Sequence, residues 1–393
     1  MNAERYQVVI VGAGLVGAAV ALALGRKGLR VALVERQPPQ PPNELWDTRI
    51  YAISPSSQRF LNSIGAWQLM DTRRIQPVFR MDVAGDTTGA VRLDAYESGV
   101  PYLASIVENG RLQHALWQAL LADGNVELFC PDVITSIEWG EPYSKLTLAD
   151  GRLLEAELVV GADGAASRLR EWANLSSTLT PYGQSGVVAN FECERPHRGT
   201  AYQWFFNGDI LAWLPLAGHR DPLVGNRFSM VWSTQPADAE VLLGLDAIAL
   251  ADRVRHAGHD QLGALRLLTP AAAFPLHLIK VQTPVAPGVA LIGDAAHGVH
   301  PLAGQGVNLG FGDAEALCEV LAQQHRRIRC GDVRGLNTYA RQRAEPVQRM
   351  QTLTHGLHHL FADDRAAWLR NAGMQCINRF PPLKAALVRE AMS

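Results

Sequence analysis

The stretch Tyr6–Gly17, with the sequence YQVVIVGAGLVG, decides the fold of this chain. Its first half is a short apolar run, which is typical of a strand buried on both faces of a parallel sheet. The next segment, Leu15–Lys27, is rich in alanine and leucine and predicts a helix that Gly28 ends in a left-handed cap. A second apolar run, Arg30–Glu35, predicts another strand, so the chain opens with a strand–turn–helix–strand unit.

The turn of this unit contains three glycines, Gly12, Gly14 and Gly17, in the G-x-G-x-x-G spacing of dinucleotide-binding sites. The first permits a tight turn, the second lets the backbone approach a pyrophosphate, and the third lets the helix pack on the sheet. The helix N-terminus offers N–H groups to the phosphates. Glu35 can accept hydrogen bonds from ribose hydroxyls and disfavours a 2′-phosphate, so FAD or NAD is expected here. The alternative is a glycine-rich turn that binds no ligand.

A second segment, LIGDAAH at Leu291–His297, also has features of a cofactor site. Asp294 follows the end of a strand, where a carboxylate can bind a hydroxyl-rich chain. A helix begins shortly afterwards, and its free N–H groups can face an anion such as a reduced flavin. The residues at this helix start are Gly304, Gln305, Gly306, Val307 and Asn308. The alternative is a capped helix start with a structural aspartate.

A third segment, VVGADG at Val159–Gly164, places Asp163 in a glycine-flanked turn after a strand. Such a turn suits a position near phosphates. Ser167 and Arg168 follow, so a structural aspartate–arginine turn pair is the alternative reading.

The remaining chain predicts a departure from the nucleotide-binding unit and a return to it. Asn109–Ala122 predicts a helix, and Val126–Asp150 alternates like strands. Gly186–Trp232 contains short aromatic and β-branched runs, including AYQWFF and ILAWLPL, which predict an antiparallel sheet. Val289–Ile292 predicts another buried strand, and the chain from Asn337 onward is mostly helical in pattern.

The composition excludes several classes of protein. Hydrophobic residues make up 48% and charged residues 19% of the 393 residues, and the net charge of -2 gives no basic face for nucleic acid. The five cysteines form no Cys-x-x-Cys pair, which argues against a disulfide framework or a zinc site. His297 and His300 lack further ligands nearby, so we expect structural roles and no metal. No signal peptide or transmembrane run is found, and a cytoplasmic protein is expected.

The three segments, in this order, resemble those of the single-component flavoprotein aromatic hydroxylases, and the resemblance covers essentially the whole chain. It is closer still to the branch that hydroxylates ubiquinone precursors. That likeness rests on DTRIYAISP at Asp47–Pro55, VENGRLQHAL at Val107–Leu116, Asp294–Asn308 and the tail from Arg370 to Lys384.

The resemblance implies an α/β fold with a Rossmann-like FAD-binding domain, an inserted antiparallel β-sheet substrate domain and a C-terminal helical tail. The expected FAD-binding domain is discontinuous and comprises residues 1–75, 100–180 and 280–335. The expected substrate domain comprises residues 76–99 and 181–279, and the helical region comprises residues 336–393.

The resemblance also implies roles for individual residues near FAD. Arg49 would approach the pyrophosphate and NADPH, and Arg111 would lie near a phosphate or ribose. Asp294 would bind the ribityl chain or pyrophosphate, and Gly306–Asn308 would line the flavin ring. The remaining implied contacts are Val133 and Arg36 near the adenine and Asp163 in a loop linked to NADPH use.

The implied reaction is hydroxylation of an aromatic ring with O2 and NADPH through a flavin C4a-hydroperoxide. A polyprenylated phenol or benzoquinol is the expected substrate, and a small soluble aromatic compound is the alternative. A flavin halogenase is disfavoured because the Trp-x-Trp-x-Ile-Pro segment is absent, Trp213-Leu-Pro-Leu being the nearest stretch. A non-enzymatic flavoprotein is a fourth option. No residue is identified as the base that deprotonates a phenol.

A lipid-soluble substrate raises the question of membrane contact. Arg365–Met392 can form a helix with an apolar face surrounded by basic residues, which suits peripheral binding to an anionic inner-membrane surface. A biosynthetic complex could instead deliver the substrate. The other reading is a helix packed on the core or against a second subunit, and the oligomeric state stays open.

Overall fold

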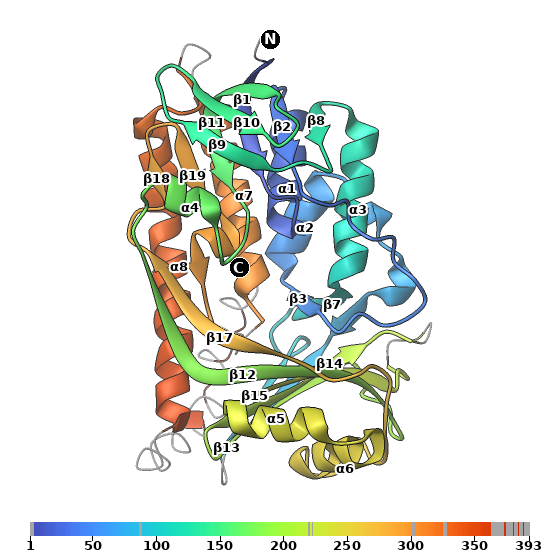
Figure 1. The fold of residues 1–393 in the computed structure, drawn as a ribbon. Helices are drawn as coiled ribbons and strands as arrows, with labels where there is room; N and C mark the ends of the chain where they lie inside the picture. The colour runs from blue at the N-terminus through green and yellow to red at the C-terminus, as the bar shows by residue number, and fades with distance from the viewer. Residues whose placement is uncertain are drawn as a thin grey trace.

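The computed structural model describes residues 4–85, 89–218, 221, 223–300, 304–324, 328–362, 373–374, 380, 384 and 388. These residues form the mixed α/β fold expected from the sequence, with a nucleotide-binding unit stacked on a second sheet (Figure 1). Among the described residues, no helix is long and apolar enough to cross a membrane. Cys130, Cys193, Cys318 and Cys330 are free thiols, and Cys376 lies outside the described residues.

The nucleotide-binding unit is built on a sheet with the strand order β18-β19-β11-β1-β2-β8. The four pairings from β19 to β8 are parallel, and β10 and β9 extend the sheet from β11 in antiparallel fashion. The bounds are β1 Glu4–Val11, β2 Val31–Val34, β8 Val126–Phe129, β9 Ile134–Glu138, β10 Ser144–Leu148, β11 Leu153–Gly161, β18 Val285–Ala286 and β19 Val289–Leu291.

Helices cover this sheet and explain its apolar strands. Helix α1 (Leu15–Arg26) packs against α3 (Asn109–Asp123) and α7 (Gly306–Gln323), and their apolar residues share one core with β1 and β2. Every residue of β2 is buried because the sheet is covered on both faces. The expected helix after the glycine turn is confirmed, and Gly28 takes the left-handed conformation with φ of +80°.

The second sheet lies beneath the nucleotide-binding unit in Figure 1 and has the order β20-β17-β12-β15-β14-β13-β5-β6, with β16 also paired to β12. All of its pairings are antiparallel except that between β13 and β5. The bounds are β5 Arg80–Ala84, β6 Ala90–Asp94, β12 Ser177–Cys193, β13 Thr200–Phe206, β14 Asp209–Leu216, β15 Arg227–Thr234, β16 Leu265–Leu267, β17 Ala272–Val281 and β20 His297–Gly298.

Two helices that the sequence pattern did not predict, α5 (Pro236–Gly244) and α6 (Ala247–Ala257), cover the lower face of this sheet. Their apolar residues pack with Trp213, Met230 and Trp232, whose side chains point to that face. The opposite face therefore turns toward the nucleotide-binding unit, as Figure 1 shows.

The connecting elements join the two units. A small antiparallel sheet contains β3 (Ile50–Ile53), β7 (Ala104–Glu108) and β4 (Gln76–Val78). Long helix α8 (Val333–Ala362) packs beside α7, and Tyr339 in it donates a hydrogen bond to the Leu291 carbonyl at 2.9 Å. The other helices in the described part of the chain are α2 Pro55–Ser63, α4 Arg168–Trp172 and the 3-10 turns η1 Trp67–Leu69, η2 Thr72–Arg74 and η3 Gly293–Ala295.

The helical pattern expected from Asn337 onward is found as α8, which begins four residues earlier at Val333. The amphipathic segment Arg365–Met392 lies almost entirely outside the described residues. The residue ranges that divide the chain into domains stay a prediction.

Candidate active site

The glycine turn between β1 and α1 shows three different reasons for its three glycines. Gly12 has φ of +98°, and a Cβ there would lie 2.6 Å from the Ala162 carbonyl oxygen. A Cβ on Gly17 would lie 1.9 Å from the Gly12 carbonyl oxygen. A Cβ on Gly14 would meet nothing within 4 Å. The protein itself thus requires Gly12 and Gly17, whereas Gly14 leaves open space where a pyrophosphate could approach, as FAD binding needs.

Glu35 lies at the end of β2, beside this turn. One carboxylate oxygen accepts a hydrogen bond from the Ala13 N–H at 2.6 Å, and the other accepts one from the Gln37 N–H at 3.1 Å. The side chain is half-buried, and the neighbouring Arg36 is exposed. The Glu35 carboxylate is therefore fixed next to the glycine turn, where the ribose contact was expected.

Val133 follows a turn that contacts Glu35 through the backbone, since the Asp132 N–H donates to the Glu35 carbonyl at 2.9 Å. The Val133 N–H donates to the Asp132 carboxylate at 2.8 Å, and its carbonyl accepts from the Ala149 N–H at 2.9 Å. The structure thus places Val133 close to Glu35, but both of its backbone groups already have partners within the chain.

Asp163 lies in the loop between β11 and α4. One carboxylate oxygen accepts a hydrogen bond from the Leu169 N–H at 3.1 Å, and the other is buried without a partner among the described residues. Arg168 lies over the Trp172 ring at 4.6 Å, so the structure does not show the alternative aspartate–arginine pair. Arg170 instead connects this loop to the Asp294 segment, because it donates to the Ala295 carbonyl at 3.0 Å.

Asp294 follows β19 and is exposed, and no hydrogen bond to its carboxylate is found among the described residues. Its pKa is raised, mainly because the surrounding protein desolvates the carboxylate, while the charges of His297 and Arg49 act in the opposite direction. The electrostatic coupling shows that Arg49 lies near Asp294 despite their separation in sequence. An exposed carboxylate that remains partly desolvated suits binding of a polar cofactor chain.

A buried aspartate, Asp313, holds the Asp294 segment in place through hydrogen bonds. Asp313 of α7 accepts hydrogen bonds from the Gly293 N–H at 2.9 Å and from Arg343 at 2.7 Å, and it lies 2.6 Å from His297. Burial would raise the pKa of Asp313, but His297 and Arg343 outweigh it, so the pKa is lowered. Sequence reasoning missed these contacts, because no local pattern links residues on three separate elements.

The two histidines of the segment have structural contacts. His297 is held by Asp313, and buried His300 lies 3.2 Å from the Gln184 side-chain oxygen and edge-on to Tyr182. The described residues contain no group of three potential ligands that could hold a metal ion.

The start of α7 presents its first turn without a side-chain cap. Gly304 has φ of +60°, and no acidic residue lies in the first turn. Gln305 occupies the N-cap position, but its side-chain oxygen accepts a hydrogen bond from the Asn308 amide at 3.0 Å and does not cap the helix. The backbone N–H groups of Gly306 and Val307 are therefore suited to face an anion.

Asn308 has a different role from its neighbours in α7. Its side chain is buried, donates to the Ala52 carbonyl at 2.9 Å and accepts from the Ser54 N–H at 3.0 Å. The Asn308 amide thus anchors the start of α7 to β3 and α2, and only its backbone remains for a cofactor.

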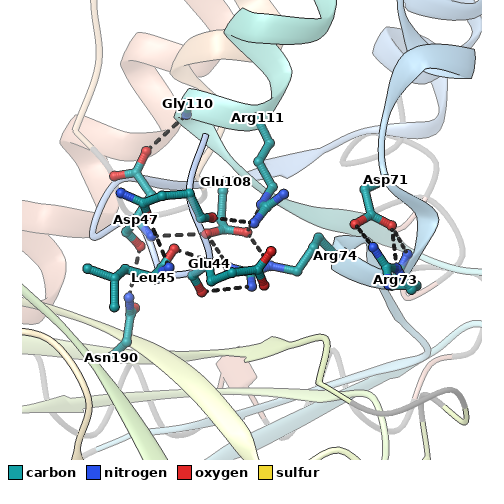
Figure 2. Close-up of polar contacts among 11 residues, drawn as sticks. Glu44, Leu45, Asp47, Asp71, Arg73, Arg74, Glu108, Gly110, Arg111 and Asn190 are labelled. Atoms are coloured by element: carbon teal, nitrogen blue, oxygen red, sulfur yellow. Dashed lines mark hydrogen bonds and ion pairs between the residues drawn. The ribbon is translucent and has the colours of Figure 1, made fainter. Parts of the chain in front are cut away.

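The two arginines expected near the phosphates differ in their surroundings. Arg49 is exposed, and no ion pair to its guanidinium is found in the described parts of the chain. Arg111 is largely buried, pairs with Glu108 at 3.0 Å and donates to the Asn43 carbonyl at 2.7 Å. Figure 2 shows Arg111 within a network that also contains Arg74 and Asp47. Of the two arginines, Arg49 therefore has the guanidinium that is more available to bind a phosphate.

Comparison with known proteins agrees with this geometry. The model of the FAD binding domain family matches residues 5–354. The 3-demethoxyubiquinol 3-hydroxylase of Escherichia coli (strain K12) is 36% identical over 82% of this chain and 81% of its own length. Ubiquinone hydroxylase UbiL of Rhodospirillum rubrum is 33% identical over 98% of this chain and 89% of its own length. Human mitochondrial ubiquinone biosynthesis monooxygenase COQ6 is 32% identical, with 98% and 92% covered.

Solved structures share the fold at lower identity. The probable FAD-dependent monooxygenase PqsL of Pseudomonas aeruginosa has a TM-score of 0.79 and 23% identity, and covers 95% of this chain and 100% of its own. The p-nitrophenol 4-monooxygenase PnpA of Pseudomonas putida DLL-E4 has a TM-score of 0.79 and 18% identity, with 100% and 99% covered. The chain therefore belongs to the FAD-binding-domain family, in the branch of FAD-dependent aromatic-ring hydroxylases that contains the ubiquinone-biosynthesis hydroxylases.

Proposed function

We propose that this FAD-dependent monooxygenase hydroxylates the ring of a polyprenylated phenol or benzoquinol in ubiquinone biosynthesis, with O2 and NADPH as co-substrates. The observation that carries the substrate class is the similarity, over nearly the whole chain, to several hydroxylases of ubiquinone precursors.

The upper face of the second sheet supports an apolar aromatic substrate. Ala212 pairs with Val231 across β14 and β15, and Leu214 lies two residues further along the same face. These three residues are half-buried, whereas Leu211, Trp213 and Met230 on the lower face are fully buried. A half-buried apolar patch of this kind, on the face that turns toward the nucleotide-binding unit, can hold a ring beside a cofactor and exclude water from it.

The residues of the chain have distinct tasks in this proposal. Bound FAD supplies the chemistry, by accepting electrons from NADPH and activating O2. The Gly14 turn and Glu35 hold the dinucleotide, and Asp294 holds its polar chain. The uncapped N–H groups at Gly306 and Val307 stabilise negative charge on the reduced ring. NADPH reaches the site on the side of Arg49 and the Asp163 loop, without a nucleotide-binding domain of its own.

An assay with a benzoquinol and a soluble phenol tests the proposal. The FAD-loaded enzyme is incubated with NADPH, O2 and a short-chain prenylated demethoxybenzoquinol, and the product is examined by mass spectrometry. We expect NADPH consumption matched by addition of one oxygen atom to the benzoquinol. Hydroxylation of the soluble phenol alone would favour the small-aromatic alternative. Failure of NADPH to support hydroxylation of either compound would overturn the proposal.

We also propose that the enzyme meets its lipid-soluble substrate at a membrane surface or within a biosynthetic complex. The support is the partition of a polyprenylated compound into the bilayer, together with the basic amphipathic pattern of Arg365–Met392.

A further inference from the structure

Asp47 is held through every one of its polar groups (Figure 2). Its N–H donates to Glu108 at 3.0 Å, and its carbonyl accepts from the Asn190 side-chain amide at 2.8 Å. Its carboxylate accepts from the Gly110 N–H and the Arg49 N–H, each at 2.9 Å. The position of Asp47 therefore fixes the position of the Arg49 backbone, two residues later.

Glu108, which accepts the hydrogen bond from the Asp47 N–H, is itself held in place. Glu108 is only 2% exposed and pairs with Arg74 at 2.7 Å and with Arg111 at 3.0 Å. Arg74 in turn lies 3.6 Å over the Trp46 ring. A buried carboxylate shared by two arginines has its charge compensated and its geometry fixed by several charge-assisted hydrogen bonds.

Asn190, which donates the hydrogen bond to the Asp47 carbonyl, comes from the second sheet. Asn190 lies in β12, is fully buried and pairs directly with Ser229 of β15, so it shares the upper face with Val231. Its backbone N–H donates to the Thr269 hydroxyl at 2.9 Å. Its side-chain oxygen has no hydrogen-bond partner among the described residues. The hydrogen bond to the Asp47 carbonyl is therefore the one polar contact that the Asn190 side chain makes within the described residues.

We propose that Asn190 is a positioning residue for Arg49, which it acts on through the Asp47 carbonyl. The sheet face that is proposed to hold the aromatic ring is thereby connected to the exposed arginine that is proposed to meet NADPH. The inference rests on the proposed function, since it assumes that Arg49 assists flavin reduction. According to this inference, Asn190, a residue of the second sheet, affects the reduction of the flavin by NADPH.

The test compares Asn190→Leu with a matched control, Thr269→Val. The leucine has a similar volume and removes the donor to Asp47, whereas Thr269→Val removes a hydrogen bond from the same strand position without touching Asp47. FAD-loaded proteins are mixed with NADPH without oxygen, and the loss of flavin absorbance gives the limiting rate and the NADPH dependence. We expect the limiting rate of Asn190→Leu to fall at least about fivefold, as loss of one hydrogen bond allows, with FAD affinity unchanged. Thr269→Val should reduce at the wild-type rate.

A double variant separates positioning from general stability. If Asn190 acts through Arg49, then Asn190→Leu combined with Arg49→Ala reduces no more slowly than Arg49→Ala alone. Additive losses, or equal losses in Asn190→Leu and Thr269→Val, would overturn the inference. Asn190→Ser, whose hydroxyl is too short to reach Asp47, replaces the leucine variant if that variant does not retain FAD.

The two proposals fail in different ways. Wild-type protein that NADPH cannot reduce would contradict the proposed function. Wild-type protein that is reduced normally, with Asn190→Leu equal to it, would leave the proposed function intact and contradict the role of Asn190.

Discussion

Replacement of Gly14 by alanine should damage cofactor binding while leaving the protein folded. Gly14 has φ of -63° and ψ of -174°, a conformation that alanine also adopts, and the added Cβ would meet nothing within 4 Å. At a compatible position such a change alters stability by only about 0.4–1 kcal/mol. The methyl group would nevertheless fill the space through which a pyrophosphate approaches the backbone. We expect FAD affinity to fall at least tenfold, which is about 1.4 kcal/mol.

The assay for this prediction uses apo-protein. Thermal unfolding without FAD reports the fold, and calorimetric titration with FAD reports the affinity. Gly17→Ala is the contrasting variant, because its Cβ would lie 1.9 Å from the Gly12 carbonyl oxygen and the backbone would have to move. That variant should lose stability even as apo-protein, by about 1–3 kcal/mol or more. Wild-type FAD affinity in Gly14→Ala would refute the assignment of this turn to the pyrophosphate.

Three further changes probe the second flavin segment and the tail. Asp294→Ala should weaken FAD binding about tenfold or more, through loss of a charge-assisted hydrogen bond; a fluorescence titration in which the affinity is unchanged would remove Asp294 from the site. Asp313→Asn should destabilise the protein by about 3–5 kcal/mol, since it breaks a buried ion pair. Because the Asp313 pKa is held below its ordinary value of 3.8, this stabilisation is present above that pH and is lost as the pH falls through the lowered pKa. The difference in unfolding midpoint between wild type and variant should therefore be constant near neutral pH and narrow only in acid. Deletion of residues 365–393 should leave a folded, yellow protein that no longer binds anionic liposomes or a partner complex, and an insoluble, flavin-free product would show that the tail belongs to the core.

The sequence predicted those parts of the site that depend on neighbours in the chain. The glycine turn is an example, because the positive φ at Gly12 and the close packing of Gly17 against the Gly12 carbonyl both arise within one strand–turn–helix unit, although the approach of Ala162 to Gly12 comes from a distant segment. The uncapped start of α7 was likewise visible as a glycine-rich segment before a helical pattern. Such features follow from local geometry, so their spacing is enough to indicate them.

The contacts that hold these local features in place could not be predicted. Asp313 binds Arg343 across two helices, and Asn190 reaches Asp47 from another sheet. Contacts of this kind leave no periodic trace in the sequence, because each needs only one suitable residue on either element. The missed helices differ, since Asp246 caps α6 through the N–H groups of Ile248 and Ala249 and was a readable start signal.

The anchoring contacts are all made to the backbone of the cofactor segments. Glu35 binds the Ala13 N–H, Arg170 binds the Ala295 carbonyl, and Asp313 binds the Gly293 N–H, so each segment is fixed by a hydrogen bond to its backbone. The open side of Gly14 and the Asp294 carboxylate, which such contacts leave available, are among the groups assigned to FAD. A site whose backbone is fixed in advance loses little conformational freedom when the ligand binds. Replacement of Arg170 or Asp313, which are assigned no contact with FAD, should therefore weaken FAD binding indirectly and also destabilise the apo-protein. Replacement of Gly14 or Asp294 should instead weaken FAD binding and leave the apo-protein stable.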